Sequence, residues 1–381
     1  MKKRVWAVAL ACVMLAAMGV MPAMAEDTIK LGGLAPLTGP VAQYGLAVQK
    51  GVDLYIEQLN AAGGIDGKKV EIIWYDEKGD EQEAVNAYNL LVDMDEVVGI
   101  IGDVTSKPMY AVVDRVKEIG IPIITASATS YDITTDNPSV FRSCFLDPFQ
   151  GTIAANFALE TLEAKKVAVI YDVADDYCIG LAEAFKAQAE KNGQEVVAYE
   201  GSTATDVDFT AQLTNIAAKA PDVLYVAHYY QSAALIVQQA AKPEVALDCY
   251  FLGADGIAGI ENVVSDPSLL DNKFFYTDHL PTDSTDPVVV DFLAAFEAKY
   301  GEPISMAFNA TGYDAALLLC EAIKAAGSTD YAAVTAALKA TDGVQGVTGK
   351  FSFDDHNDPI KSAYIMTFEG GKQTFRVRQD P

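Results

Sequence analysis

The sequence predicts an α/β protein with two doubly wound (Rossmann-like) lobes, and three observations support this fold class. Short apolar, β-branched segments such as 97–101 and 121–125 suit strands that are buried on both faces of a parallel sheet. Helical spacing of apolar residues alternates with these segments, as between Met109 and Ile119. The alternation pauses near 141–148 and then restarts, and a chain of 381 residues is long enough for two cores.

Each element is expected from the period of its apolar residues and from the Gly, Pro, Ser, Thr or Asn residues that bound it. In the first block we expect strands at 28–34, 69–76, 97–101 and 121–125, with helices at 44–62, 81–94 and 109–119. In the second block we expect strands at 166–171, 195–199, 222–227, 250–252 and 274–277, with helices at 179–191, 209–218 and 232–240. Helices at 287–300, 308–325 and 331–340 follow, and then a hairpin of 349–353 with 362–368. No loose linker separates the blocks, which favours several short crossings and a hinge.

The amino terminus has the order of a secretory signal peptide. Lys2, Lys3 and Arg4 precede an uncharged run from Val5 to Met21, and Ala23-Met24-Ala25 is a small-residue cleavage site. We therefore expect residues 1–25 to be removed and the product to be soluble and periplasmic. The formal charge of −26 becomes about −29 without those three cations, so the sequence predicts no nucleic-acid partner.

The sequence lacks the common motifs for catalysis, metal binding and cofactor binding. The sequence has no G-x-S-x-G, no H-E-x-x-H, no P-loop and no G-x-G-x-x-G, so no cofactor is expected. His228, His279 and His356 lie far apart, although His228 could line a cleft beside Tyr229. The four cysteines of the exported chain form no C-x-x-C pair, and buried free thiols are the expectation for them. An enzyme is therefore disfavoured.

Small polar turns follow two adjacent strands of the first block, at 105–106 and 127–129. The carboxyl ends of parallel strands meet at one edge of a sheet, where helix amino termini favour anions, so a carboxylate site is one interpretation. Ordinary Ser/Thr helix caps are the alternative. Further polar and aromatic residues follow other strands, namely Tyr44, Asp176-Tyr177, Tyr229-Tyr230 and Asp255-Gly256. Together they predict a binding cleft between two lobes, without a nucleophile.

An ordered series of short segments resembles the periplasmic Leu/Ile/Val-binding proteins, which are solute receptors of ABC transporters with the type I binding-protein fold. The segments are Gly39-Pro-Val-Ala-Gln-Tyr-Gly45, Asn60-Ala-Ala-Gly-Gly-Ile65, Ile101-Gly102 with Ser106, Ile124 to Thr129, Asp206-Val-Asp-Phe209 and Phe251-Leu-Gly-Ala-Asp-Gly256. The resemblance covers nearly the whole exported chain. It implies three crossings, near Asp147, Asp278 and Asp354. The implied lobes are 26–147 plus 278–354, and 148–277 plus 355–381.

The resemblance also implies a set of ligand contacts. The ligand carboxylate would contact Ser106, Ser127, Ala128 and Thr129, and the amino group would contact Asp255, Thr129 and the backbone of Val104. Tyr177 and Tyr229 would cover the ligand, and Tyr44 and Phe308 would form the pocket for its side chain. Thr105 and Gly256 complete the expected site. We therefore expect a monomeric, exported receptor that closes on an aliphatic, branched-chain amino acid and delivers it to a membrane permease. The alternatives left open are a binding protein for an amide or an aromatic acid, and a soluble sensor component.

Overall fold

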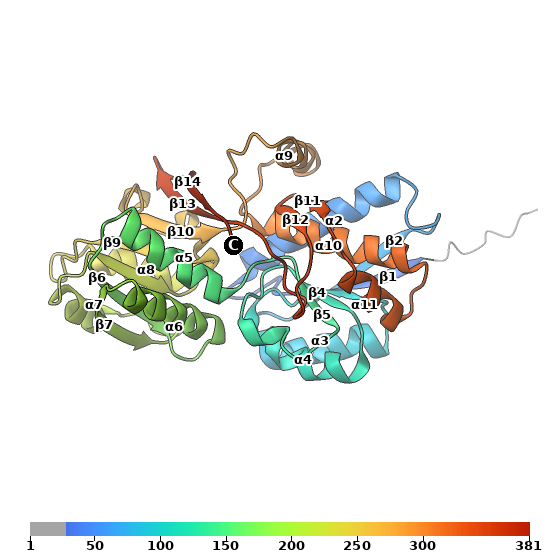
Figure 1. Ribbon diagram of the computed structural model, residues 1–381, viewed down its shortest axis with the longest axis horizontal. Helices are drawn as coiled ribbons and strands as arrows, with labels where there is room; N and C mark the ends of the chain where they lie inside the picture. Colours follow the sequence, from blue (N-terminus) through green and yellow to red (C-terminus); the bar gives the residue numbers. More distant parts are fainter. Residues whose placement is uncertain (1–27) are drawn as a thin grey trace, which may run out of the picture.

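The computed structural model describes residues 28–381, so the expected signal peptide and its cleavage site lie outside the described residues. The strands form two large sheets, each covered by helices (Figure 1). The blue and cyan elements of one lobe lie to the right in Figure 1, and the green and yellow elements of the other lie to the left. The expected α/β class with two doubly wound lobes is therefore confirmed.

The first lobe is built on five parallel strands in the order β2-β1-β3-β4-β5. These are β1 (Ile29–Ala35), β2 (Val70–Asp76), β3 (Ile100–Ile101), β4 (Ile123–Thr125) and β5 (Val140–Arg142). Its helices are α2 (Ala42–Ala61), α3 (Glu81–Asp93), α4 (Ser106–Ile119), α10 (Phe308–Ala326) and α11 (Tyr331–Lys339). Helices α2 and α10 bury apolar residues against one face of the sheet, and α3 and α4 against the other.

Two glycines allow α2 and α10 to approach each other closely. A Cβ atom on Gly51 would lie 1.9 Å from the carbonyl oxygen of Asn309, and one on Gly312 would lie 2.5 Å from that of Val48. Any larger residue would therefore force the two helices apart. The close crossing fixes the amino-terminal half of α2 beside the start of α10, which brings together two of the expected ligand residues.

The second lobe has seven strands in the order β14-β13-β10-β9-β8-β6-β7, in which β13 runs antiparallel to both of its neighbours, β10 and β14. These are β6 (Lys166–Asp172), β7 (Glu195–Ser202), β8 (Val223–Ala227), β9 (Tyr250–Gly253), β10 (Phe274–Asp278), β13 (Ala363–Glu369) and β14 (Lys372–Gln379). Its helices are α5 (Asp147–Glu160), α6 (Asp176–Lys191), α7 (Thr210–Ala217) and α8 (Tyr230–Ala240). Alternate residues of β6 and β8 pack against α5 and α6 on one face and against α7 and α8 on the other.

The chain passes from one sheet to the other three times: after β5, after β10, and between the short hairpin β11 (Val344–Gly346)–β12 (Gly349–Phe351) and β13. Helix α9 (Pro287–Tyr300) follows the second passage and stands at the top of Figure 1. The lobe boundaries given above agree with this strand order and stay a prediction.

The expected hairpin of 349–353 with 362–368 is wrong. Strand β12 pairs with β11, whereas β13 joins the other sheet between β10 and β14. Only the bridge between Phe353 and Pro359 remains of that pairing. The reason is that the polar segment between them is a crossing, which the buried Arg142–Asp358 ion pair holds in place. Strands β5, β11 and β14 and helix α5 were not predicted, and β3 is shorter than expected.

Candidate functional site

A small cavity lies where the carboxyl ends of the two sheets face each other. It is lined by ten of the twelve residues expected from the sequence: Tyr44, Val104, Thr105, Ser106, Ser127, Tyr177, Tyr229, Asp255, Gly256 and Phe308. The other two, Ala128 and Thr129, are fully buried next to this lining. The cavity volume is about 10 Å³, room for roughly one water molecule. The aromatic walls must therefore separate to admit a ligand.

The first lobe presents the amino terminus of α4 to this cavity. Thr105 is the N-cap residue, and its side chain makes no capping hydrogen bond. First-turn N–H groups lack partners inside a helix, so those of α4 can hold an anion together with the Thr105 and Ser106 hydroxyls. The neighbouring turn contributes fewer donors than expected. The Ser127 hydroxyl donates to the Val104 carbonyl at 2.6 Å, and the Ala128 N–H donates to Thr125 Oγ1 at 2.9 Å.

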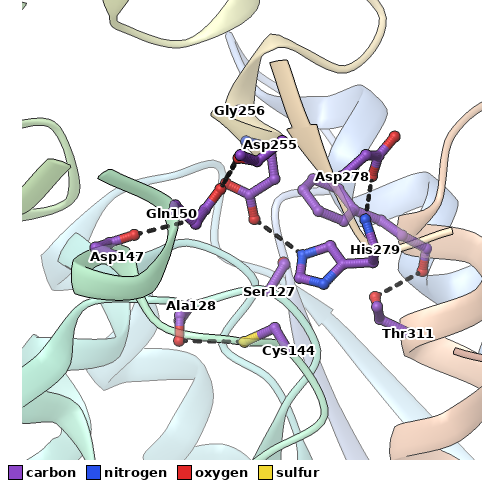
Figure 2. Close-up of polar contacts among 12 residues, drawn as sticks. Ser127, Ala128, Cys144, Asp147, Gln150, Asp255, Gly256, Asp278, His279 and Thr311 are labelled. Carbon is purple, nitrogen blue, oxygen red and sulfur yellow. Dashed lines mark hydrogen bonds and ion pairs between the residues drawn. The ribbon is translucent and has the colours of Figure 1, made fainter. Parts of the chain in front are cut away.

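The second lobe presents a buried carboxylate, Asp255, in the short helix η2 (Asp255–Ile257) that follows β9. Its Oδ1 accepts hydrogen bonds from the Tyr177 hydroxyl at 2.8 Å and from Gln150 Nε2 at 3.0 Å. Its Oδ2 lies 3.0 Å from Nε2 of His279 (Figure 2). A carboxylate accepts about four hydrogen bonds, so these three leave one for a further donor.

All three partners of Asp255 are uncharged. Burial lowers the pKa of His279 to about 4, so its ring is neutral at pH 7 and donates from Nε2. Among the ion pairs of residues 28–381, none joins Asp255 to a Lys or Arg. The negative charge of Asp255 is therefore buried and hydrogen-bonded, but no cation of the described chain balances it.

Aromatic rings form the walls between these two polar ends. Tyr177 and Tyr229 stack with their ring centroids 5.1 Å apart and their planes 8° from parallel. Tyr44 packs edge-to-face against Phe308 at 5.3 Å, and its hydroxyl donates to the carbonyl of Gly256 at 2.6 Å. A Cβ atom on Gly256 would lie 2.6 Å from the Tyr177 hydroxyl oxygen, so glycine alone fits there. The Tyr44–Gly256 bond joins the two lobes directly across the cavity.

Sequence reasoning missed two residues around Asp255. Gln150 lies in α5, a helix that was not predicted, and it bridges Asp147 and Asp255 (Figure 2). His279 stacks on Phe145 at 3.8 Å. His228, which could have lined a cleft, does not line the cavity, and its Nε2 pairs with Ser202 Oγ at 2.9 Å. No sequence pattern marks Gln150 or His279, because only the fold brings them to Asp255.

Other chemistry has little support within the described chain. No group of three or more His, Cys, Asp or Glu in residues 28–381 is arranged to hold a metal ion. The cysteines expected to be free, Cys144, Cys178, Cys249 and Cys320, are free and buried. None of the helices in this part of the chain is both long and apolar enough to cross a membrane.

Comparisons with known proteins agree with this geometry. The family model described as "Periplasmic binding protein" matches residues 28–373. The Leucine-, isoleucine-, valine-, threonine-, and alanine-binding protein of Pseudomonas aeruginosa is 32% identical over 362 residues, covering 93% of each chain. A branched-chain amino acid transporter substrate binding protein of Streptococcus pneumoniae, solved with isoleucine, is 35% identical. It superimposes with a TM-score of 0.86 over 93% of this chain and 99% of that one.

A solute binding protein of an ABC transporter from R. palustris, solved with benzoate, is also similar. It is 25% identical, with a TM-score of 0.82 over 93% of this chain and 97% of that one. Proteins of this kind bind solutes without transforming them, so the expectation of a binding protein rather than an enzyme is confirmed. This chain therefore belongs to the periplasmic binding protein family, as a solute-binding protein of an ABC transporter.

Proposed function

We propose that this protein captures a free α-amino acid with an aliphatic, branched side chain and delivers it to a membrane permease. One observation carries the choice of an amino acid. Asp255 is a buried carboxylate that three neutral donors hold in place and that no Lys or Arg of residues 28–381 balances. A ligand ammonium would supply the missing positive charge.

Both charges of a zwitterion need an opposite charge or a hydrogen-bond partner once water is excluded, because an unpaired buried charge is strongly unfavourable. The amino terminus of α4, with the Thr105 and Ser106 hydroxyls, attracts a carboxylate. Asp255 lines the same cavity and attracts an ammonium. The two ends lie on opposite lobes, so one ligand that meets both would hold the lobes together.

The walls favour an apolar side chain. Tyr44, Tyr229 and Phe308 present ring surface to the cavity, and Asp255 is the one ionisable acid or base in its lining apart from the tyrosine hydroxyls. An aspartate or lysine side chain would bury a second charge without a partner there. The relative of known structure that carries isoleucine supports the same choice.

An aromatic carboxylic acid is the second candidate, because the benzoate-bound relative shares the fold. Such a ligand would find donors at α4 and rings at Tyr44 and Phe308. It would leave Asp255 without a cation, and the closed cleft would then hold two negative charges. The charge of Asp255 therefore favours the amino acid.

Calorimetric titration of the exported chain with leucine, isocaproate and benzoate tests this proposal. Isocaproate has the carbon skeleton and carboxylate of leucine without its amino group. We expect leucine to bind and both acids to bind at least about thirtyfold more weakly, the factor for about 2 kcal/mol lost with a charge pair. Benzoate binding more tightly than every amino acid would overturn the proposal.

The export step is part of the proposal. Processing after Ala25 would give a mature chain that begins at Glu26. Amino-terminal sequencing of protein recovered from the periplasm should read Glu26 first. An intact Met1 would contradict export by this route.

A further inference from the structure

Two buried acidic side chains lie directly behind the turn that is proposed to hold the ligand carboxylate. Glu77 follows β2 and Asp103 follows β3, the strands on either side of β1. Both residues are completely buried, and their carboxyl groups hydrogen-bond to each other. Neither side chain pairs with a Lys or Arg among the ion pairs of residues 28–381.

The contact requires a proton between the two groups. Glu77 Oε2 accepts the N–H groups of Gly79 at 2.6 Å and Asp80 at 3.1 Å, and Asp103 Oδ1 accepts the N–H of Val104 at 2.6 Å. The remaining oxygens, Glu77 Oε1 and Asp103 Oδ2, are buried with no N–H or hydroxyl donor in the described chain. Two carboxylate oxygens only accept hydrogen bonds, so they attract each other only when one carries a proton.

Burial sets the pH at which the pair loses a proton. Burial, together with the adjacent charge of Asp76, raises the pKa of Glu77 to about 7, and burial raises the pKa of Asp103 well above its usual value. The other elements packed against Asp103 offer no charge, because α4 contributes Met109 and β4 contributes Thr125. The pair therefore gains negative charge as the pH rises through neutrality.

The acidic pair is tied to the ligand site by a short series of hydrogen bonds. The Asp103 carbonyl accepts the Thr125 hydroxyl at 2.6 Å, and Thr125 Oγ1 accepts the Ala128 N–H. Asp103 also directly precedes Val104 and Thr105, which line the cavity. New negative charge on the pair therefore arises within two residues of the α4 amino terminus.

We propose that Glu77 and Asp103 act as positioning residues for the ligand carboxylate, and that the protons they hold keep negative charge away from the α4 amino terminus. This inference rests on the proposed carboxylate site at Thr105 and Ser106. Loss of a proton from the pair would place a like charge beside the ligand carboxylate and weaken binding. Binding of ligands without a carboxylate would not be weakened in this way.

The affinity for leucine between about pH 6 and about pH 8 tests the proposal. If only the fully protonated pair binds leucine well, a group with a pKa of about 7 makes the dissociation constant about tenfold larger at pH 8. Glu77→Gln keeps an oxygen for the Gly79 and Asp80 N–H groups but cannot ionise, so its affinity should change less than about twofold over this range. Asp103→Asn leaves Glu77 buried and able to ionise, so it should keep a pH-dependent affinity.

Glu261→Gln is a matched control. Burial also raises the pKa of Glu261, but this residue pairs with Gln373 in the second lobe and does not line the cavity. This variant should keep the tenfold change. The comparison between variants also removes the contributions of Asp175, with a pKa of about 6, and of Lys361, with a pKa of about 8. A Glu77→Gln profile equal to that of the wild type, or a flat wild-type profile, would overturn the inference.

A second measurement separates this inference from the proposed function. If the wild type bound no amino acid at any pH, the proposed function would fail. Infrared spectra would still test the proton. A protonated carboxyl band present at about pH 6 and reduced at about pH 8 should be lost in Glu77→Gln and kept in Glu261→Gln. An unchanged band in Glu77→Gln would show that Glu77 does not hold this proton and would overturn the inference on its own.

Discussion

Replacing Asp255 by Asn removes the negative charge of the proposed ammonium site while keeping its shape. The Asn carbonyl can still accept one hydrogen bond from Tyr177 or Gln150, so the loop that begins at η2 should keep its fold. The variant then presents a neutral group to a ligand ammonium that has lost its water. The ammonium charge would stay buried without a counter-charge.

The magnitude follows from that stranded charge. Truncating one partner of a buried, hydrogen-bonded charge pair costs about 2–5 kcal/mol, mostly the penalty of the charge left behind. At about 1.4 kcal/mol per factor of ten, leucine should bind Asp255→Asn at least about thirtyfold more weakly. Isocaproate has no ammonium, so removing the carboxylate should leave its affinity unchanged or improve it.

Calorimetric titration of both proteins with both ligands forms a cycle that isolates the coupling between Asp255 and the amino group. Asp278→Asn is the control, since Asp278 is also buried near His279 but does not line the cavity. Burial raises the pKa of Asp278 well above its usual value, so its replacement removes little charge at pH 7. Equal weakening of leucine and isocaproate by Asp255→Asn would refute the reasoning, because the loss would then be structural.

Three further predictions concern the closed cleft, the crossings and acid stability. Tyr44→Phe removes the hydroxyl that donates a hydrogen bond to Gly256 across the lobes, so calorimetry should show the affinity for leucine falling about fivefold. Tyr225→Phe is the control and should leave the affinity unchanged, because the buried Tyr225 hydroxyl has no partner in the described chain. Arg142→Met leaves the carboxylate of Asp358, which lies 2.6 Å from Arg142 Nε, without its partner. Denaturant titration should show the free energy of unfolding falling by about 3–5 kcal/mol. Adding Asp358→Leu should reverse part of this loss, and no reversal would contradict the prediction. Burial lowers the pKa of His228 to about 4, so the unfolded chain binds this proton first and the protein loses stability as the pH falls below about 6.5. Between about pH 7 and pH 4.5, the free energy of unfolding of His228→Gln should fall by about 2 kcal/mol less than that of the wild type. An equal fall in both proteins would refute the assignment.

Local pattern was enough to predict most of the fold. Strands buried on both faces are short apolar runs, and the helices between them have apolar residues at helical spacing. The alternation of strands and helices was therefore visible in the sequence from Ile29 to Thr277. The pattern failed where tertiary pairing decides the outcome. Residues 349–351 pair with β11 because the segment after them is held as a crossing. The Arg142–Asp358 contact and the bond from Lys361 Nζ to the Ser143 carbonyl at 2.8 Å hold it.

The candidate site was predictable where its residues follow strands, as Ser106, Tyr229 and Asp255 do. It was not predictable where residues serve the site from helix interiors or crossings. Gln150 and His279 lie 105 and 24 positions from Asp255, and no spacing in the sequence relates them to it. The proton between Glu77 and Asp103 was equally hidden, because it depends on two strand ends meeting in a place without water.

The placement of the two charged ends on different lobes links selectivity to lobe closure. A ligand shifts the balance between open and closed forms only by its difference in affinity for the two. The α4 amino terminus belongs to the first lobe and Asp255 to the second, so only a closed cleft can answer both charges of a zwitterion. A ligand with a carboxylate alone would gain little from the approach of Asp255. The group that selects amino acids would therefore also make closure depend on them.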